Sequence, residues 1–299
     1  MFSALEVFSD LSERLYYNIP DFPLYVYKGT LHQFDRYAAA CHWHPDLEFI
    51  LVLDGAMDYF VNGQTVYLSK GNGIFVNRKR LHYGFSADKT DCLYITVLVH
   101  PILLGESLPA GKACLDEKFG SDNDDFILLT AQTTWQAEVL ILLNQIYDEM
   151  HSEKRSLLRL LSQAVTLCAC IEEHIQHISG QNDVEESWMI IRKMTGYIHQ
   201  HYDLKITIDD IAAAGTVCRS KCYELFNKYV GQTPNNYLFQ YRIQKGREML
   251  RETKRPICEI AIACGFQTAS YFSYVFRKEM GIIPQDFRKQ AQNLPLQEQ

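Results

Sequence analysis

The sequence has no apolar segment long enough to cross a membrane and no cysteine pair spaced for a zinc finger. None of its apolar runs reaches the roughly 18 residues that a membrane helix needs, and no signal or transit peptide pattern opens the chain. The nine cysteines are odd in number, include no CxxC pair and are scattered through apolar segments. This usage is typical of reduced, buried thiols. We therefore expect a cytoplasmic protein without a membrane partner or a disulfide scaffold.

The motifs of the common enzyme classes are also absent. The chain has no nucleophile motif, no phosphate-binding glycine-rich loop and no cofactor fingerprint. The sequence therefore predicts no catalytic residue and no cofactor, and it favours a protein that acts by binding.

Charge is distributed unevenly along a chain whose 299 residues suggest two domains. Residues 1–186 hold 13 Lys/Arg against 26 Asp/Glu, a formal charge of −13, whereas residues 187–299 hold 16 against 10, a charge of +6. Phosphates attract the basic part and repel the acidic part. The asymmetry thus indicates that nucleic acid is a partner of the C-terminal part.

The C-terminal part contains one supersecondary unit twice. Residues 208–237 align with residues 257–287 at a shift of 49 before the turn and 50 after it. A unit of about 50 residues used twice means two copies of one element. Each copy has the apolar spacing of a helix–turn–helix, and in the first copy Thr207 and Asp210 form an N-terminal capping pattern. The positions that match are Ser220 and Ser270, Phe226 and Phe276, Lys228 and Lys278, Gly231 and Gly281, and Pro234 and Pro284.

The second helix of each unit has a polar face opposite its apolar one. Such a helix can lie in the DNA major groove, with its N-terminal residues on base edges and its cations on phosphates. We expect the DNA contacts to be Arg219, Ser220, Lys221, Tyr223, Glu224 and Lys228 in the first unit, and Ser270, Tyr271, Ser273, Tyr274, Arg277 and Lys278 in the second.

These motifs resemble the paired helix–turn–helix domain of AraC/XylS-type transcription regulators. The resemblance covers about residues 188–290 and is carried by SKCYELFNKYVGQTP (220–234), EIA…CGF (259–266) and YFSYVFRKEMGIIPQDFR (271–288). Cys222 stands where that family usually carries Leu, and a buried Cys serves as a small hydrophobe. The resemblance implies binding of double-stranded promoter DNA and a small-molecule effector, contact with RNA polymerase, a homodimer, and activation more often than repression.

Residues 23–101 show short β runs separated by turn signals. Asn62-Gly63 is a hairpin signal and Gly71-Asn72-Gly73 a loop. Strands at this spacing, without a helical period, predict a small β-barrel or sandwich. The runs are 24–29, 47–55, 57–63, 64–73, 74–77 and 92–100.

A group of imidazoles and a carboxylate lies within these runs. The pattern His42-x-His44-x₃-Glu48, followed by Gly55 and later His82, resembles the cupin double-stranded β-helix over about residues 30–100. Inward positions of that fold hold such side chains. The group suits a divalent metal ion, mutual pairing inside a barrel, or hydrogen bonds to a polar effector. A metal would make the chain a metal-dependent cupin enzyme or a metal sensor with a helical tail.

The resemblance to a regulator favours the effector over the metal. We expect His42, Trp43, His44, Glu48 and His82 to contact a small molecule, with no metal ligand assigned. Aromatic residues nearby could stack on a sugar ring, although aromatic residues in strands more often form core. They are Tyr25, Tyr27, Tyr59, Phe75 and Tyr83, together with Trp43.

The fold expected is a multidomain α and β protein, with an N-terminal cupin-like β-barrel followed by helices and a C-terminal all-α domain. Residues 1–125 form the arm and the effector-sensing β domain, with a loop-rich connector over 102–125. Residues 126–178 are helical and dimerise, and 179–187 are a polar linker. Residues 188–299 form the double helix–turn–helix domain. Within it a helix over 236–251 joins the two units, and Gly246 marks a place where another backbone comes close.

Overall fold

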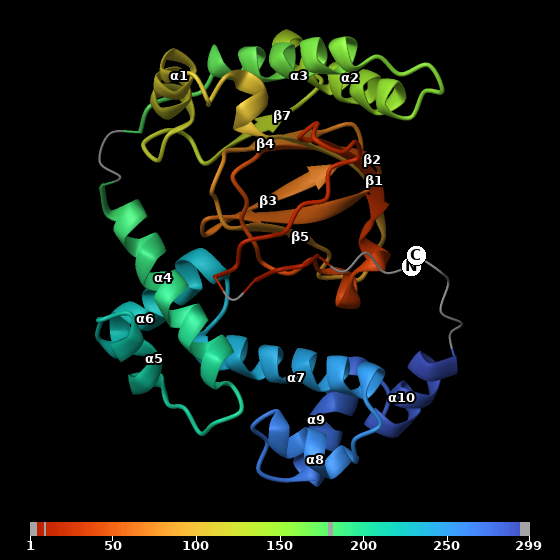
Figure 1. Cartoon of the computed structure of the whole chain (residues 1–299), viewed down its shortest axis with the longest axis vertical. Coiled ribbons are helices and arrows are strands. Elements are labelled where there is room, and N and C mark those ends of the chain that lie inside the picture. Colours follow the sequence, from red (N-terminus) through yellow and green to blue (C-terminus); the bar gives the residue numbers. More distant parts are fainter. Residues whose placement is uncertain (1–4, 9, 179–181, 294–299) are drawn as a thin grey trace. The chain divides into compact units, whose positions relative to one another are not determined.

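The computed structural model describes residues 5–8, 10–178 and 182–293, and the chain forms two compact units (Figure 1). The first unit holds Met1–Met189 and Lys228–Gly231, and the second holds Ile190–Asn227 and Gln232–Gln299. All nine cysteines are free thiols, but Cys114, Cys218 and Cys258 are exposed rather than buried. Of the helices in the described ranges, none has both the length and the apolar character that a membrane crossing requires.

The first unit combines an antiparallel β-sheet with helices, as the sequence predicts. Its strands are β1 (Leu24–Thr30), β2 (Leu47–Val61), β3 (Gln64–Ser69), β4 (Gly73–Val76), β5 (His82–Phe85), β6 (Cys92–Val99) and β7 (Phe126–Leu129). Its helices are α1 (Pro109–Phe119), α2 (Thr134–Met150) and α3 (Leu157–Glu172), with short 3₁₀ turns η1 (Leu31–Gln33), η2 (Asp35–Tyr37) and η3 (Pro101–Leu104).

The long strand β2 organises the sheet, although the sequence predicts two separate runs there. Its first half pairs with β4 and β6, and its second half pairs with β3 and β5. Between the halves the register shifts at Val52/Asp54, and Gly55 has φ of 76°. A Cβ on Gly55 would lie 2.4 Å from the carbonyl oxygen of Asp91. The bulge and this glycine let one strand serve both parts of the sheet.

Alternate residues of β2 face two different cores. Phe49 and Leu51 lie in a cluster with residues of α2 and α3, which cover this face of the sheet (Figure 1). Ile50 and Val52 lie in a second cluster on the opposite face. Because side chains alternate along a strand, Glu48 shares the face of Ile50.

Three segments differ from the predicted secondary structure. Residues 126–129 were expected to be helical, but they form β7 and pair with β4. A short apolar run such as FILL does not distinguish strand from helix by its period, and the available edge of β4 supplies its hydrogen bonds. The connector over 102–125 contains α1, and the run that carries His82 forms β5, which was not among the expected strands.

The second unit is helical. The elements from Asn182 onward are α4 (Asn182–His201), α5 (Ile208–Ala214), α6 (Arg219–Leu225), a π-helical turn η4 (Phe226–Val230), α7 (Pro234–Glu252), α8 (Ile257–Ala263), α9 (Ala269–Met280) and α10 (Pro284–Asn293). The start of α4, up to Met189, and the end of η4, from Lys228, are counted with the first unit. The predicted linker over 179–187 is partly wrong, because α4 begins at Asn182; residues 179–181 lie outside the described residues. The connecting helix α7 is longer than predicted, because Thr233 caps it at its first turn.

Both helix–turn–helix units form where the repeat predicts them, as α5–α6 and α8–α9, joined by α7 (Figure 1). Thr207 and Asp210 make the predicted capping box. Cys222 is fully buried, as are Phe272 and Phe276 on the matching face of α9. The sequence therefore defines the apolar faces of both units.

Gly246 on α7 packs against a side chain, whereas the sequence predicts a close approach of another backbone there. A Cβ there would lie 2.8 and 2.9 Å from two ring atoms of Phe272.

We expect Gly246→Ala to lower the free energy of unfolding by about 1–3 kcal/mol through overpacking. In α4, among the described residues, nothing lies within 4 Å of a Cβ on Gly196, so Gly196→Ala should raise it by up to about 1 kcal/mol. Equal shifts in urea unfolding would contradict this difference.

Candidate functional site

Two of the predicted imidazoles are placed by direct backbone pairing. His42 N donates to His82 O at 3.2 Å, and His82 N donates to His42 O at 2.9 Å. Residues paired in this way project their side chains to the same face. His44, two residues from His42, also lies on this face. The three rings are close together, with centroids 4.4 Å apart for His42 and His82, 4.8 Å for His44 and His82, and 5.8 Å for His42 and His44.

Each of these rings has its Nδ1 atom bonded to a backbone carbonyl. His42 Nδ1 lies 2.8 Å from Ala40 O, His44 Nδ1 lies 3.2 Å from Asp46 O, and His82 Nδ1 lies 2.8 Å from Arg80 O. A carbonyl oxygen only accepts, so each Nδ1 carries the hydrogen. The three rings offer ligand atoms that all lie within 4.8 Å of one another, which makes them a compact set of nitrogen donors.

Glu48 on β2 faces the same group. Its Oε1 accepts a hydrogen bond from Tyr59 Oη at 3.0 Å. Its Oε2 lies 2.7 Å from His82 Nε2 and 3.5 Å from His44 Nε2, but neither contact has ordinary hydrogen-bond geometry. Four of the five predicted effector residues therefore converge on one buried point, and Trp43 does not.

The charge of the group follows from its burial and its mutual contacts. Burial lowers the pKa of His42 well below its ordinary value, and the imidazoles of His82 and His44 lower it further. Burial opposes the charge on His44, but the Glu48 carboxylate outweighs it and raises the pKa of His44. Burial likewise opposes the charge on Glu48, yet His82 and His44 hold the pKa of Glu48 well below its usual range. Glu48 is thus ionised and His42 neutral.

Glu13, which was not among the predicted site residues, joins the group from the N-terminal segment. Its Oε2 lies 3.5 Å from His42 Nε2, and both side chains are 8% exposed. Burial raises the pKa of this carboxyl to about 7. The segment is held because Glu13 N donates to Trp43 O at 2.9 Å and Trp43 N donates to Leu11 O at 2.9 Å. Nothing in the local pattern SERLYY distinguishes this glutamate from a surface one.

Trp43 faces away from the predicted effector site. It alternates with His42 and His44 along an extended segment, so its side chain projects to the other side. There its Nε1 donates to Asp10 O at 2.9 Å. The prediction that Trp43 contacts an effector inside the sheet is therefore wrong; the residue anchors the N-terminal segment instead.

A cavity of about 80 Å³ opens beside the imidazoles. That is room for about five to eight waters. His42, His44 and Glu48 line it, whereas His82 contributes only through its contacts with them. Of the predicted aromatic faces, Tyr25, Tyr27 and Tyr59 line the cavity, but Phe75 belongs to the core beneath the helices. The N-terminal segment closes part of the wall with Leu5, Glu13 and Leu15.

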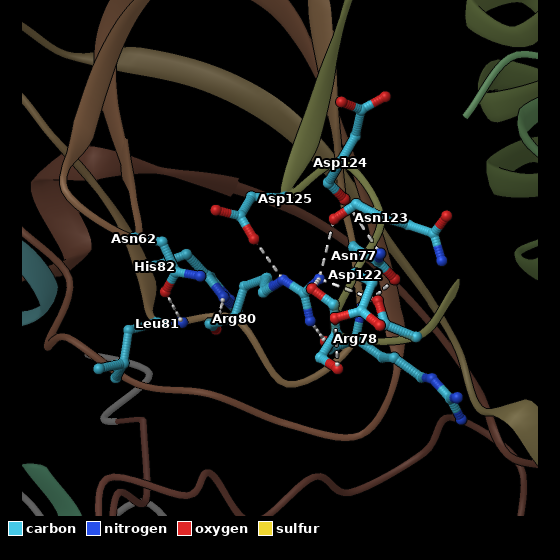
Figure 2. Close-up of polar contacts among 12 residues, drawn as sticks. Asn62, Asn77, Arg78, Arg80, Leu81, His82, Asp122, Asn123, Asp124 and Asp125 are labelled. Atoms are coloured by element: carbon cyan, nitrogen blue, oxygen red, sulfur yellow. Dashed lines mark hydrogen bonds and ion pairs between the residues drawn. The ribbon is translucent and has the colours of Figure 1, made fainter. Parts of the chain in front are cut away.

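Two buried arginines fix the segment that carries His82. Arg80, only 4% exposed, donates to Asp125 Oδ1 at 2.6 Å and to three carbonyl oxygens of residues 120–123 (Figure 2). Arg78 donates to Phe119 O at 2.9 Å and to Leu115 O at 3.1 Å, at the end of α1. Because Arg80 O in turn accepts from the His82 ring, these contacts set the orientation of that imidazole.

The residues predicted to read DNA from the first helix–turn–helix lie on α6 and the turn that follows it. Ser220, Glu224 and Lys228 are exposed. The charged ones have partners within the chain: Arg219 pairs with Asp209, and Lys221 Nζ lies 2.7 Å from Glu224 Oε1. Tyr223 Oη accepts from Asn235 at 3.3 Å.

The residues predicted from the second helix–turn–helix lie on α9. Thr268 caps this helix and Gly281 ends it, and Arg277 and Lys278 occupy its last turn. Ser270 is exposed, Ser273 is half-buried, and Tyr271 and Tyr274 are 53% and 66% exposed. All six predicted residues are carried by one helix, and its solvent-facing side combines hydroxyl groups, aromatic rings and two cations.

Comparison with known proteins gives two family matches. Residues 211–290 match a helix-turn-helix domain family, and residues 29–167 match the AraC-like ligand binding domain family. The uncharacterized HTH-type transcriptional regulator YdeC of Bacillus subtilis is 28% identical over 286 residues, covering 94% of this chain and 96% of that protein. The melibiose operon regulatory protein of Escherichia coli is 23% identical over 264 residues, 84% of each. The crystal structure of ToxT from Vibrio cholerae aligns with 91% of this chain and 99% of its own, at 12% identity and a TM-score of 0.42.

Proposed function

This chain belongs to the AraC-type family of transcriptional regulators, and we propose that it binds promoter DNA through α6 and α9 in response to a small molecule held in the first unit. The observation that carries this proposal is the pair of helix–turn–helix units, each presenting one polar helix face. Their net charge of +6 over residues 187–299 supports attraction to phosphates. The cavity beside His42, His44 and Glu48 is the effector site in this proposal.

The two reader helices are proposed to read one asymmetric site. In the single chain, α7 joins them, and its 19 residues span about 28 Å at 1.5 Å per residue. Successive major-groove faces are about 34 Å apart. Two units in one chain point the same way along DNA, unlike the two halves of a symmetric dimer. In the first helix–turn–helix unit, we assign contacts with base edges to Ser220, Tyr223 and Glu224. We assign contacts at the wall of the groove to Arg219 and Lys221.

Glu224→Ala should relax the base preference at one or two positions. A glutamate that accepts a hydrogen bond from cytosine N4 contributes about 1–3 kcal/mol of discrimination against the wrong base. To reach a base, Glu224 must first give up its 2.7 Å contact with Lys221. Selection from random DNA, followed by sequencing, measures the preference at every position. Glu252→Ala, at the exposed end of α7, is the matched control. A palindromic consensus, or unchanged preferences in the Glu224 variant, would rule out this arrangement.

The effector is proposed to be a small polar molecule, with sugars as the first class to test. One relative regulates a melibiose operon, and melibiose is a sugar. The cavity has room for about five to eight water molecules, which is less than a sugar ring with its hydroxyl groups needs, so a sugar enters only if the N-terminal segment moves away from the cavity wall. Support for a polar ligand comes from the imidazoles, the carboxylate and the tyrosine hydroxyl groups that line the cavity.

A bound effector should stabilise the full chain against heat. At a concentration about 100 times its dissociation constant, a ligand adds about 2.7 kcal/mol to the stability of the unit that binds it. A thermal-shift screen of sugars and other metabolites, with and without divalent metals, measures the effect. The same screen on Tyr59→Phe, which lacks one hydroxyl in the cavity wall, should give a smaller shift. If no compound shifted the melting transition, the effector site would be rejected.

We further propose a homodimer formed through α2 and α3, and activation through contact with RNA polymerase. The solvent side of these helices exposes large apolar side chains, with Ile141 57% and Leu158 78% exposed. Exposed apolar groups of this size favour burial against a partner surface. No enzymatic activity is proposed. Among the residues that the structure describes, the imidazole group is the one observation that favours an enzyme.

A further inference from the structure

The cavity beside the imidazoles has acidic walls. Glu13 and Glu48 both line it, and their side chains are 8% and 6% exposed. Among the described residues that line the cavity, none is a lysine or an arginine. Residues 1–186, which include the whole β-sheet, also carry a formal charge of −13. Such a cavity concentrates positively charged ligands, because the charges around it have one sign.

The two carboxylates differ in how their charge is balanced. Although burial opposes it, the Glu48 carboxylate raises the pKa of His44 to about 9, so His44 is protonated and offsets the charge of Glu48. Glu13 instead contacts His42, at 3.5 Å, and burial keeps the pKa of His42 so low that this ring is neutral. Burial also raises the pKa of Glu13 to about 7. Among the described residues, the Glu13 carboxylate therefore has no protonated group in contact with it.

Four tyrosines line the cavity, and the hydroxyl groups of three of them already have partners. Tyr59 Oη donates to Glu48 Oε1 at 3.0 Å. Gln33 accepts from Tyr27 Oη at 2.8 Å, and its Nε2 donates to Tyr94 Oη at 3.2 Å. A ligand therefore meets ring surface here more than free hydroxyl groups. The faces of such rings attract cations, and they do so more strongly where water is excluded.

Tyr25, the fourth tyrosine, lies close to the unbalanced carboxylate. Burial and then the charge of Glu13 raise the pKa of Tyr25 to about 12, so the two side chains are within electrostatic reach of each other. The Tyr25 ring also stacks on Tyr27, with centroids 6.1 Å apart and planes 27° apart. A carboxylate beside aromatic rings is an arrangement that suits an ammonium group, which gains from both the charge and the ring faces.

We propose that the effector is a small organic ammonium ion whose charged group lies between the Glu13 carboxylate and the rings of Tyr25 and Tyr59. This inference rests on the effector site proposed above and narrows its ligand from polar molecules in general to cations. Room for about five to eight water molecules accommodates an ion of the size of ethanolamine or choline. Such an ion fits without displacing the N-terminal segment, which a sugar ring would have to do.

Binding is tested by calorimetry on the full chain, without DNA. The probes are ethanolamine, tetramethylammonium and choline, together with 3,3-dimethyl-1-butanol, the neutral isostere of choline that has carbon in place of the charged nitrogen. At least one ammonium ion should bind, and the neutral isostere should bind at least about 30-fold more weakly than choline, as expected for loss of one partner of a buried charge pair.

Two results would overturn the ammonium ion as the ligand class. One is the failure of all three ammonium probes to bind at millimolar concentration, and the other is equal affinity for choline and its neutral isostere. Neither result would remove the effector site itself. That site stands if a sugar or another neutral compound shifts the melting transition of the chain, so the two proposals fail separately.

The role of Glu13 is tested by removing its charge. Glu13→Gln keeps the volume and should weaken binding of the ammonium ion at least about 30-fold while leaving affinity for the neutral isostere unchanged. Glu6→Gln removes an exposed glutamate of the same segment, which pairs with Arg14 at 3.3 Å, and should bind as the wild type does. Equal affinity of the Glu13 variant and the wild type for the ion would overturn the assignment.

The role of the rings is tested at Tyr25. Tyr25→Phe keeps the aromatic face and should retain the preference for the ion over its neutral isostere. Tyr25→Leu keeps an apolar side chain without that face and should reduce the preference about tenfold. Thermal melting of the ligand-free variants checks that each one folds. Equal preference in the Phe and Leu variants would exclude a contact between the ion and this ring.

Proton release gives a second readout for Glu13. A bound cation favours the ionised carboxylate, so binding near pH 7, where this carboxyl is about half protonated, should release about half a proton. Affinity should accordingly rise between about pH 6 and pH 8. Calorimetry in two buffers of different ionisation enthalpy measures the release.

Glu13→Gln is the control for this release as well, because it keeps every other titratable group around the carboxyl. These groups are His42, His44, Asp46, Glu48, Tyr25 and Tyr59. Any release that they cause would persist in the variant, whereas release from Glu13 would disappear. Binding of the cation to the wild type without proton release would place the ion away from Glu13 and overturn the assignment.

Discussion

Arg80→Met should lower the free energy of unfolding of the β-sheet unit by about 3–5 kcal/mol, because it removes one partner of a buried ion pair. Asp125 would keep its charge with 14% of its side chain exposed, and the carbonyl oxygens of Gly120, Ser121 and Asn123 would each lose a donor. Methionine preserves most of the side-chain volume, so a cavity contributes little. The loss therefore reports the polar contacts shown in Figure 2.

Urea unfolding of the full chain measures this effect. All three tryptophans, Trp43, Trp135 and Trp188, lie in the first unit, so fluorescence follows its transition. Lys79→Met is the matched control, since Lys79 is the exposed neighbour of Arg80 in the same loop. We expect the control to change stability by no more than about 0.5 kcal/mol. A loss below about 1 kcal/mol for Arg80→Met would mean that the 120–125 loop holds its place without this guanidinium.

Raising the salt concentration from 50 to 200 mM should weaken DNA binding by about 100-fold. Four phosphate contacts, assigned to Lys221, Lys228, Arg277 and Lys278, give a log–log slope of roughly −3.6 by counterion release. Arg277 and Lys278 are exposed in the last turn of α9, and Lys228 is exposed beyond α6. Lys221 contributes only if it exchanges Glu224 for a phosphate.

Fluorescence anisotropy with a selected DNA site, measured at several salt concentrations, gives the slope. Removing one contact in Lys278→Gln should make the slope shallower by about 0.9 and weaken all sequences about equally. Lys112→Gln removes the same charge from α1 in the first unit, where Lys112 pairs with Asp116, and should leave the slope unchanged. Binding that ignores salt would exclude the phosphate contacts altogether.

Much of the secondary structure could be predicted from local patterns. The capping pair Thr207 and Asp210 and the apolar spacing around Phe226 and Phe276 identified both helix–turn–helix units. The turn signal at Asn62-Gly63 identified the hairpin between β2 and β3. The exceptions are short segments. Residues 126–129 became a strand because β4 had an edge to pair with, and an apolar run of four residues has no period that reveals this.

The residues of the candidate site could likewise be predicted from the sequence only in part. The spacing of His42, His44 and Glu48 on alternate positions was enough to predict that they share a face, and it should have placed Trp43 on the other. The sequence does not reveal that Glu13, about thirty residues earlier, reaches the same point, because a glutamate among polar neighbours has no local signature of burial. Only the pairing of residues 11–13 with Trp43 brings it there.

The sequence by itself determined the family, the two helix–turn–helix units and the set of imidazoles, because repeats and fixed spacings are written in neighbouring residues. The tertiary structure decided which side chains meet: Arg80 with the loop over 120–125, Gly246 with the Phe272 ring, and Glu13 with His42. Such contacts join residues that are distant along the chain, and they form only when strands pair and helices pack. Local propensity carries no information about them, because it depends on neighbours in sequence and not on neighbours in space.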